Sequence, residues 1–198
     1  MVIKNAAEFD DTIREKLSKL FVENFEKELS FISKNKKTLI QALAHIFVLD
    51  TIYVVIIDNE PAGIIGSIDK ERRSVKFKIN KLIKHLGMIK AFLVMIVLKQ
   101  HINMFPQYSV EKYTKTASIA FVAVDRKYMK MGVLLEMLKR FLSYINITYI
   151  IEVEETKREA MWFYQQLGFK EVYRENYLFP KSLVKNNVVY MLYNGVVC

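Results

Sequence analysis

Cysteine is almost absent from this chain, since its one thiol belongs to Cys198. A single thiol can form neither an intrachain disulfide nor a cysteine metal cluster, which excludes a small disulfide-stapled scaffold. We therefore expect a reducing, cytoplasmic compartment. Histidine is also scarce, and His45, His85 and His101 show no metal-ligand spacing, so we expect no metal site.

Long apolar runs are lacking as well. The longest uninterrupted one, residues 91–98, is far shorter than the roughly 20 residues of a membrane-spanning helix, so we expect no transmembrane segment. The first residues, MVIKNAAEFDD, do not combine a basic region with an apolar core, and we expect no secretory signal there. Because no repeat, low-complexity tract or linker divides the chain, we expect a single domain over residues 1–198.

Acidic residues are the minority charge, with 21 Asp and Glu against 30 Lys and Arg, which gives a formal net charge of +9. The excess favours anionic partners such as phosphorylated small molecules, nucleic acid or a membrane surface, although a solvated surface explains it equally well. It is concentrated in residues 69–90, where eight basic residues accompany two acidic ones. No interleaving of aromatic and basic residues typical of nucleic-acid recognition is present, so we expect no nucleic-acid partner.

Two helical patterns and a strand pair occupy the N-terminal part of the chain. Their expected bounds are 9–27 and 37–48 for the helices, and 53–57 and 62–68 for the strands. Asp10 or Asp11 can cap the first helix. The two strands flank Asp58-Asn59-Glu60-Pro61, which is turn chemistry, and the pattern therefore predicts an antiparallel hairpin.

The pattern changes midway through residues 69–108. Residues 75–79 alternate apolar and polar side chains, as a half-exposed strand does. From Lys81 the apolar spacing is helical and predicts a helix that continues through Gly87 to about His101. Three interpretations are open: an amphipathic flap over a substrate cleft, an element that binds an anionic surface, or a basic helix whose apolar side packs on the core.

Residues 117–169 are the region around which the rest of the chain is organised. Their predicted order is strand, Gly-containing turn, helix, strand and helix. Two further strands are expected at 170–179 and 188–196. Each strand-to-helix junction presents helix N-terminal N–H groups that lack intrahelical partners, which is a favourable place for a phosphate group. The order of elements predicts one α/β domain with a mixed sheet.

Two blocks of this region, VAVDRKYMKMGVLLEMLKRF and IIEVEETKREAMWFYQQLGF, resemble the GNAT superfamily of acyl-CoA-dependent N-acyltransferases. In the second block Glu152-Val153, Ala160, Phe163-Tyr164 and Leu167-Gly168-Phe169 fall at the spacing of the family. Lys157 stands where the family usually has Asn, and we count it among the cofactor-binding candidates.

The resemblance covers roughly the whole chain and treats residues 69–108 as an enlarged variable segment. It implies an α/β, three-layer α+β fold in which a central mixed, mostly antiparallel twisted sheet is flanked by helices.

The first block departs from the family's Arg/Gln-x-x-Gly-x-Gly/Ala turn, which the resemblance makes the pyrophosphate site. Aligned through Gly132, the chain has Met129 at the Arg/Gln position, Lys130 at the first Gly and Leu134 at the last Gly/Ala. No proline interrupts the turn, so its backbone N–H donors are retained. The side chains of Lys130 and Leu134 crowd the approach, while Lys130 also offers an ammonium to a phosphate. The cofactor-binding candidates are therefore Met129, Lys130, Met131, Gly132, Val133 and Leu134, with the backbone of Ala123 and Val124 aligning the pantetheine arm.

Acetyl transfer to an amine needs a base for the amine and an acid for the leaving thiolate. Alternation along the strand 149–154 places Glu152 on the face of Ile150 and Glu154, where apolar neighbours would desolvate it and raise its pKa. The strand advances about 10 Å beyond Glu152, at about 3.3 Å per residue, and the following helix returns about 10 Å to Tyr164, at about 1.5 Å per residue. Glu152 and Tyr164 are therefore expected level with each other.

The resemblance implies that Tyr164 is the general acid. It also implies that Glu152 is the base, as in members that acetylate protein N-termini. Many members carry a Glu in the earlier strand, but Ile119-Ala120-Phe121 here contains no acid, so the base role falls to Glu152 or to a water relay. Two structural alternatives are open: Tyr164 as an aromatic packed beside Trp162 and Phe163, and Glu152 in an ion pair.

We therefore expect an acetyl-CoA-dependent N-acetyltransferase in which the primary amine of a small molecule or peptide attacks the thioester directly, without a metal. A catalytically inactive GNAT-like module that binds acyl-CoA or regulates another process is the main alternative. A nucleic-acid binder that uses residues 70–90 is a third hypothesis. The acceptor, the acyl chain and the oligomeric state are open, with a homodimer as one alternative.

Overall fold

A single seven-stranded sheet forms the centre of the computed structural model, which describes residues 1–30, 32–102, 116–129, 131–145, 147–175 and 187–195. The strand order is β1-β2-β3-β4-β5-β7-β6, and neighbouring strands are antiparallel except the parallel pair β4 and β5. The strands are β1 (Val2–Asn5), β2 (Ile52–Ile57), β3 (Glu60–Ile68), β4 (Thr116–Val124), β5 (Thr148–Glu154), β6 (Lys170–Glu175) and β7 (Val188–Tyr193). The mixed, mostly antiparallel sheet confirms the expected fold class.

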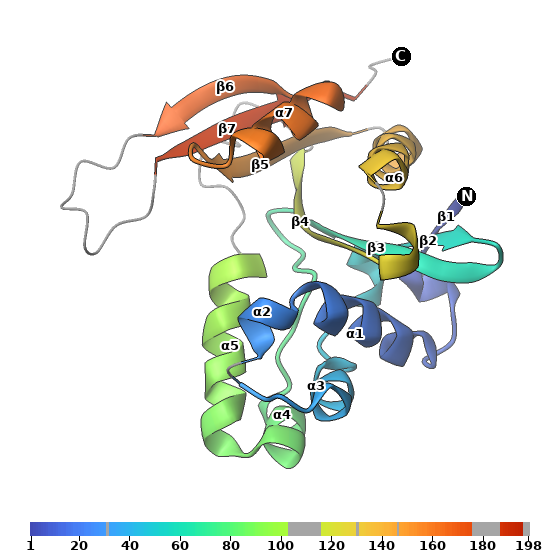
Figure 1. Cartoon of the computed structure of the whole chain (residues 1–198), viewed down its shortest axis with the longest axis vertical. Helices are drawn as coiled ribbons and strands as arrows, with labels where there is room; N and C mark the ends of the chain where they lie inside the picture. Colours follow the sequence, from blue (N-terminus) through green and yellow to red (C-terminus); the bar gives the residue numbers. More distant parts are fainter. Residues whose placement is uncertain (31, 103–115, 130, 146, 176–186, 196–198) are drawn as a thin grey trace.

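Helices cover both faces of the sheet and make three layers (Figure 1). The layer on one face contains α1 (Ile13–Asn24), α2 (Glu26–Leu29), α3 (Lys36–Leu43), α4 (Ile79–Leu86) and α5 (Met88–Ile102). The layer on the other face contains α6 (Met131–Ile145) and α7 (Arg158–Gln166). Each layer buries its own apolar cluster against the sheet, because strand side chains alternate between the faces: Val54 joins the first cluster and Val55 the second.

The predicted hairpin is confirmed as β2 and β3. Asp58 and Asn59, between the strands, both have positive φ, 52° and 62°. Two consecutive positive-φ residues form the turn whose twist matches that of paired strands, and Asp and Asn tolerate this conformation better than other non-glycine residues. Local turn chemistry was therefore sufficient to predict this pairing.

Several predicted elements differ from the structure. The first helix begins only at Ile13, where the Asp10 carboxylate accepts a hydrogen bond from the Thr12 N–H at 2.9 Å. The second helix ends at Leu43, because the chain then turns and Phe47 bridges Val75. The predicted strand at 75–79 is wrong, since this bridge is its only strand-like pairing among the described residues.

Two further differences concern the strands near the two ends of the chain. Strand β1 was not predicted, although it pairs along β2 from Val2 to Asn5. Strands β6 and β7 end at Glu175 and Tyr193, before the predicted ends, and residues 176–179 and 196 of those predictions lie outside the described part of the chain.

The long helix predicted from Lys81 is two helices, α4 and α5. Gly87 separates them and has φ 75°, a left-handed conformation that ends a helix and that glycine adopts without steric cost. Its N–H donates to the Ile83 carbonyl at 2.8 Å, which closes the last turn of α4. The two helices therefore form a hairpin rather than one rod.

Candidate active site

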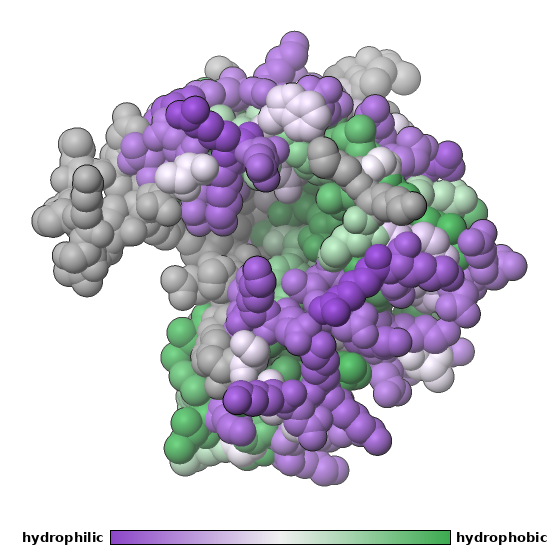
Figure 2. Space-filling model, in the orientation of Figure 1, coloured by the Kyte–Doolittle hydropathy of each residue, from purple (hydrophilic) through white to green (hydrophobic). Residues whose placement is uncertain are grey.

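Strands β4 and β5 diverge soon after they begin. Thr116 lies opposite Thr148 and Ala117 opposite Tyr149, and within these two fully described strands no further residue pair joins them. Beyond Ala117 of β4 and Tyr149 of β5, the two strands are no longer paired with each other. The backbone N–H and C=O groups on their facing edges therefore point into a gap. Figure 1 shows the two strands separating, and Figure 2 shows a recess with hydrophobic walls in the middle of the same face.

A β-bulge in β4 accompanies the divergence. Gly66 of β3 pairs with Phe121 and Ser67 with Ile119, so Ala120 is the extra residue. Ala120 and Phe121 consequently both contact the cluster on the α1–α5 side. A bulge bends its strand and increases the local twist, which is a physical reason for β4 to turn away from β5.

The gap is also bordered by the end of helix α1. The Asn24 side-chain amide accepts a hydrogen bond from the Val124 N–H at 3.1 Å and donates to the Val124 carbonyl at 2.9 Å. Its Nδ2 also donates to the Leu20 carbonyl at 2.8 Å, which orients the amide. Asn24 thus takes the place of a neighbouring strand at the end of β4.

This contact changes which backbone groups face the gap. Backbone groups alternate along a strand, and those of Val124 point to Asn24, while the Asp125 N–H donates to the Ala62 carbonyl of β3 at 2.8 Å. The backbone of Ala123, opposite Ile64, accordingly faces β3, and that of Val122 faces the gap. Of the predicted pair, Val124 therefore has its backbone groups on the side of the gap, while those of Ala123 point to β3.

The turn after β4 leads directly into α6. It contains the short 3₁₀ helix η4 (Arg126–Tyr128), capped by the Asp125 carboxylate, which accepts from the Lys127 N–H at 2.8 Å. Met129 follows with 56% of its side chain exposed. Helix α6 begins at Met131, so its first N–H groups open toward this turn. Lys130 lies outside the described residues.

Gly132 and Leu134 behave differently from each other at the start of α6. A Cβ added at Gly132 would meet no atom within 4 Å, so open space adjoins the backbone there. Leu134 is partly buried against the cluster on the α6–α7 side, as is Leu135. The Leu134 side chain, which was expected to crowd the turn, therefore packs in part on the protein. Val133 is half-buried.

An ion-pair chain joins this turn to the α1–α5 layer. The Arg126 guanidinium lies 2.7 Å from the Glu26 carboxylate, and the Lys36 ammonium lies 2.8 Å from the same oxygen. Lys36 first, and then Arg126, hold the pKa of the exposed Glu26 carboxyl below its usual value. Glu26 therefore neutralises the one arginine of the turn.

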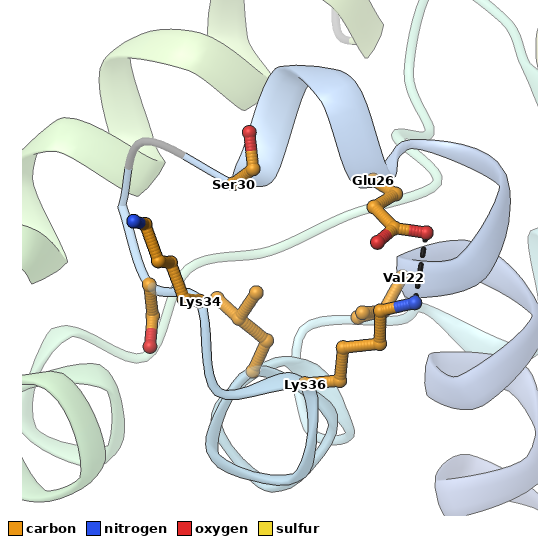
Figure 3. Close-up of a pocket in the computed structure, with 7 residues that line it drawn as sticks. Val22, Glu26, Ser30, Lys34 and Lys36 are labelled. Carbon is orange, nitrogen blue, oxygen red and sulfur yellow. Dashed lines mark ion pairs between the residues drawn. The ribbon is translucent and has the colours of Figure 1, made fainter.

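Glu26 and Lys36 also line a pocket of about 120 Å³ between α2 and the start of α3 (Figure 3). Its lining residues are Val22, Glu26, Ser30, Ser33, Lys34, Lys36 and Leu39. Figure 3 shows Glu26 and Lys36 pointing toward each other, with Lys34 pointing away from them. The buried Val22 and Leu39 supply its apolar side, and the only carboxylate among the lining residues is already in two ion pairs, so this pocket offers no acid and base pair.

Tyr164 lies on α7 and packs against the cluster on the α6–α7 side. Its ring centroid is 5.7 Å from that of Phe163 and 5.5 Å from that of Phe169, both in edge-to-face geometry. Burial raises the pKa of the Tyr164 hydroxyl above its usual value, so it stays protonated at neutral pH. No group in the described part of the chain hydrogen-bonds this hydroxyl.

Glu152 lies on the other face of the sheet. Its neighbours Ile151 and Val153 join the α6–α7 cluster, while Ile150, on the face of Glu152, packs with Tyr190 in a separate cluster. Glu152 is exposed on this face. Glu152 and Tyr164, which were expected to lie level with each other, are therefore on opposite faces of the sheet.

Lys157 is the N-cap residue of α7. Its ammonium lies 3.2 Å from the Glu154 carboxylate, and 61% of its side chain is exposed. No side-chain hydrogen bond caps the helix at this position. The first turn of α7 therefore has no side-chain cap from its N-cap residue.

Sequence reasoning missed Val122, the bulge at Ala120 and the contact of Asn24. The first two follow from strand pairing, which no local pattern reports. Asn24 is separated from Val124 by one hundred residues and looks like an ordinary polar residue at a helix end. Gly66 was the available signal for the bulge, since a Cβ there would lie 2.4 Å from the Phe121 ring.

The membrane and metal expectations can be compared with the structure only where it is described. No helix in the described ranges is long and apolar enough to cross a membrane. His, Cys, Asp and Glu residues of the same ranges form no group of three or more that could hold a metal ion.

Solved structures of other proteins have a fold similar to that of this chain. No family model matches the chain, and no curated protein matches it by sequence. Among solved structures, histone acetyltransferase HPA2 and related acetyltransferase from Corynebacterium glutamicum superposes with a TM-score of 0.60 at 14% identity, over 100% of this chain and 97% of that one. An N-acetyltransferase from Staphylococcus aureus Mu50 gives 0.55 at 14% identity, over 98% and 100%. The acetyltransferase (GNAT family) from Bacillus anthracis gives 0.52 at 11% identity, over 97% and 93%. The chain thus has the fold of the GNAT-family acetyltransferases.

Proposed function

We propose that this protein is an acetyl-CoA-dependent N-acetyltransferase that transfers an acetyl group to a primary amine. The observation that carries the proposal is the gap between β4 and β5, which opens beyond Ala117 and ends at the N-terminus of α6. Such a gap offers unpaired strand backbone to an extended chain that contains amides, and helix N–H groups to an anion. Acetyl-CoA combines a pantetheine arm with a pyrophosphate in that order.

The backbone of β4 would align the pantetheine arm. Val122 and Val124 are the residues whose N–H and C=O groups point into the gap, so a pantetheine amide would pair there as a neighbouring strand does. The groups of Val124 are held by Asn24, whose primary amide has the same donor and acceptor as a peptide. Binding at Val124 therefore exchanges the Asn24 amide for a pantetheine amide.

The pyrophosphate would lie at the turn that leads into α6. The N–H groups of Met131, Gly132 and Val133 begin this helix, and open space adjoins Gly132. We keep Met129, Lys130 and Leu134 in the site as backbone contributors, since the side chain of Leu134 packs inward. Lys157 adds a cation at the start of α7, on the other side of the gap.

The reaction requires a neutral amine and a protonated leaving group. The amine nitrogen attacks the thioester carbonyl carbon, the C–N bond forms, and the C–S bond then breaks to release the CoA thiolate. Tyr164 would protonate the thiolate, because burial raises the pKa of its hydroxyl and the group is therefore in its acid form at neutral pH. Glu152 would take the proton of the amine.

Residues on opposite faces of the sheet can serve one reaction here because the sheet is open between β4 and β5. A thioester in this gap has one side toward α7, which carries Tyr164, and the other toward the exposed face of Glu152. The amine acceptor would then approach from the side of Glu152 and the α1–α5 layer. A small molecule or a peptide N-terminus fits an approach from solvent.

Asn24 is also the observation that favours the alternative, a GNAT-like module without catalysis. If the Asn24 amide cannot leave Val124, the gap does not accept pantetheine and the fold serves another role. Titration calorimetry with acetyl-CoA separates the two functions. Saturable heat supports the enzyme, whereas an absence of heat up to millimolar acetyl-CoA contradicts the proposed function.

A thiol-release assay identifies the acceptor class. The full chain is incubated with acetyl-CoA and a panel of simple amines, polyamines, aminoglycosides and peptides, and free CoA is measured over time. The proposal expects at least one amine to raise CoA release well above the rate with acetyl-CoA alone. Binding of acetyl-CoA without amine-dependent release by any member of the panel would instead indicate a non-catalytic acyl-CoA-binding module.

A further inference from the structure

Helix α5 exposes an unusual amount of apolar side chain. Met88, Ile89, Phe92 and Ile96 are 64%, 75%, 50% and 60% exposed, and Leu93 is 37% exposed. Their spacing, i, i+1, i+4, i+5 and i+8, places them on one face of the helix. This face, with Ile83 of α4, is called the outer face of the α4–α5 hairpin below.

The opposite side of α5 already supplies the contact with the protein. Ala91, Val94 and Leu98 are buried in the cluster of the α1–α5 layer, and Met95 packs against it. The expectation that the apolar side of this segment packs on the core is therefore correct for one stripe only. A helix that is apolar all round is normally covered on all sides, yet the outer face of α5 is not covered by any described residue.

The apolar exposure is concentrated in this place. The exposed large hydrophobic side chains of the described residues number twelve, and six of them lie within residues 83–96. The others are scattered over β1, the turn before α6, α6, α7 and β6. Figure 2 shows hydrophobic side chains gathered at the edge of the molecule where Figure 1 places α5. A contiguous exposed apolar patch marks an interaction surface, whereas single exposed residues do not.

Exposed lysines lie on the two helices that carry the outer face. Lys81 and Lys84 of α4 and Lys90 of α5 are exposed. The sequence contains no Asp or Glu from Arg72 to Val110, so no acidic side chain of this segment offsets them. An apolar helix face flanked by lysines is the pattern of helices that lie in the plane of a membrane surface, with their apolar side chains in the headgroup region and their cations near anionic lipids.

We propose that the outer face of the α4–α5 hairpin docks this protein peripherally on an anionic lipid membrane. The face combines exposed apolar side chains of α5 with exposed lysines of α4 and α5, which suits a broad anionic lipid surface. A second copy of the chain fits less well, since a symmetric interface would bring Lys84 and Lys90 of both copies together without acidic partners. The proposal is independent of the acetyl transfer proposed above.

Vesicle flotation of the full chain tests the proposal. Vesicles of phosphatidylcholine alone are compared with vesicles that also contain phosphatidylglycerol, at low and at high salt. We expect binding to the anionic vesicles only, and weaker binding at high salt because the lysine contribution is screened. Equal recovery with both lipids, or no recovery with either, would overturn the proposal.

Matched variants separate the two contributions. Ile89→Ser with Phe92→Ser should lower the fraction bound by about tenfold or more, because apolar area is removed from the face. Lys81→Gln with Lys84→Gln and Lys90→Gln should lower it and remove its salt dependence. The controls are Trp162→Ser, an exposed apolar residue elsewhere, and Lys16→Gln with Lys19→Gln and Lys27→Gln on α1 and α2. Controls that lose binding as strongly as the patch variants would contradict the assignment.

A fluorescent reporter gives a second readout. The chain contains one tryptophan, so Trp162→Phe with Phe92→Trp moves the only indole to the outer face. Its emission should shift to the blue with anionic vesicles and stay unchanged without them. Light scattering measures the oligomeric state. If the wild-type chain is a dimer and Ile89→Ser with Phe92→Ser makes it a monomer, the face is a subunit interface and lipid docking is overturned.

Discussion

Asn24 and Val124 are joined by two hydrogen bonds between the side-chain amide of one and the backbone of the other, at 2.9 and 3.1 Å. The contact satisfies the last residue of β4 at the point where β5 has diverged from it. In the proposed function, the same backbone groups pair with pantetheine. Asn24 thus stabilises the free protein and competes with the co-substrate.

Asn24→Ala should therefore change stability and affinity in opposite directions. The free energy of unfolding of the free protein should fall by about 1–2 kcal/mol, because the side-chain hydrogen bonds to the backbone of Val124 and Leu20 are lost. The affinity for acetyl-CoA should rise by about 3- to 10-fold, since the ligand no longer displaces a protein amide. Thermal unfolding and titration calorimetry measure the two effects. Weaker acetyl-CoA binding by the variant would show that Asn24 assists the ligand instead of competing with it.

Tyr164→Phe should lower the rate of acetyl transfer by about 10²-fold or more, with little change in CoA affinity, because it removes a general acid and no contact to the nucleotide. The wild-type rate should also fall at high pH as the Tyr164 hydroxyl ionises, and the variant should lose this dependence. Tyr144→Phe, an exposed tyrosine of α6, is the control. A Tyr164→Phe rate close to wild type would remove Tyr164 from the mechanism.

Glu152→Gln should lower the rate of amine acetylation by about 10²-fold near neutral pH, since the amine must then lose its proton without a base. The deficit should shrink as the pH approaches the pKa of the amine, because the substrate is then already neutral. Glu159→Gln, at an exposed carboxylate of α7, is the control. A deficit that does not depend on pH would indicate a structural contribution of Glu152.

Gly66→Ala should destabilise the fold by about 1–3 kcal/mol through overpacking. A Cβ at this position would lie 2.4 Å from Cε1 and 2.8 Å from Cζ of Phe121, at the bulge of β4. Combined with Phe121→Leu, the change should cost less than the sum of the single variants. Gly132→Ala is the control: it meets open space within a helix and should be neutral or stabilising by about 0.5–1 kcal/mol.

His45 should make stability depend on pH. Burial, and then the charges of Lys81, His85 and Lys78, lower the pKa of His45 from 6.5 to about 4. Between these two values the unfolded chain binds a proton that the folded chain does not, so stability is full above pH 6.5 and falls as the pH drops toward 4. Because water partly screens the ring, we expect a loss of only about 1–2 kcal/mol.

Denaturant unfolding at several pH values measures this loss. His45→Gln should flatten the curve between pH 6.5 and 4, whereas His85→Gln, at an exposed histidine of α4, should only weaken the dependence, since it removes one of the charges that lower the pKa of His45. Carboxylates titrate in the same range, so the difference between the two variants carries the result. Identical curves for wild type and His45→Gln would contradict the assignment.

Local chemistry was enough to predict much of the fold. The turn at Asp58-Asn59 identified one hairpin, and apolar periodicity identified α6, α7 and the strands around them. The same periodicity failed at Gly87, where spacing suited to one long helix is divided by a residue that adopts φ 75°. It failed again at 75–79, because alternation also suits an extended segment that makes a single bridge.

For the candidate site, too, the sequence and the tertiary structure supply different information. Residue types and spacing led to the prediction of Tyr164, Glu152 and the turn before α6, since each pattern depends on neighbours within a few residues. Three-dimensional pairing was needed to show that Glu152 and Tyr164 occupy opposite faces, that Val122 rather than Ala123 faces the gap, and that Asn24 already holds Val124. The physical reason is range: periodicity and turn chemistry act between neighbours in the chain, whereas the divergence of β4 from β5 and the contact of Asn24 join residues that only folding brings together.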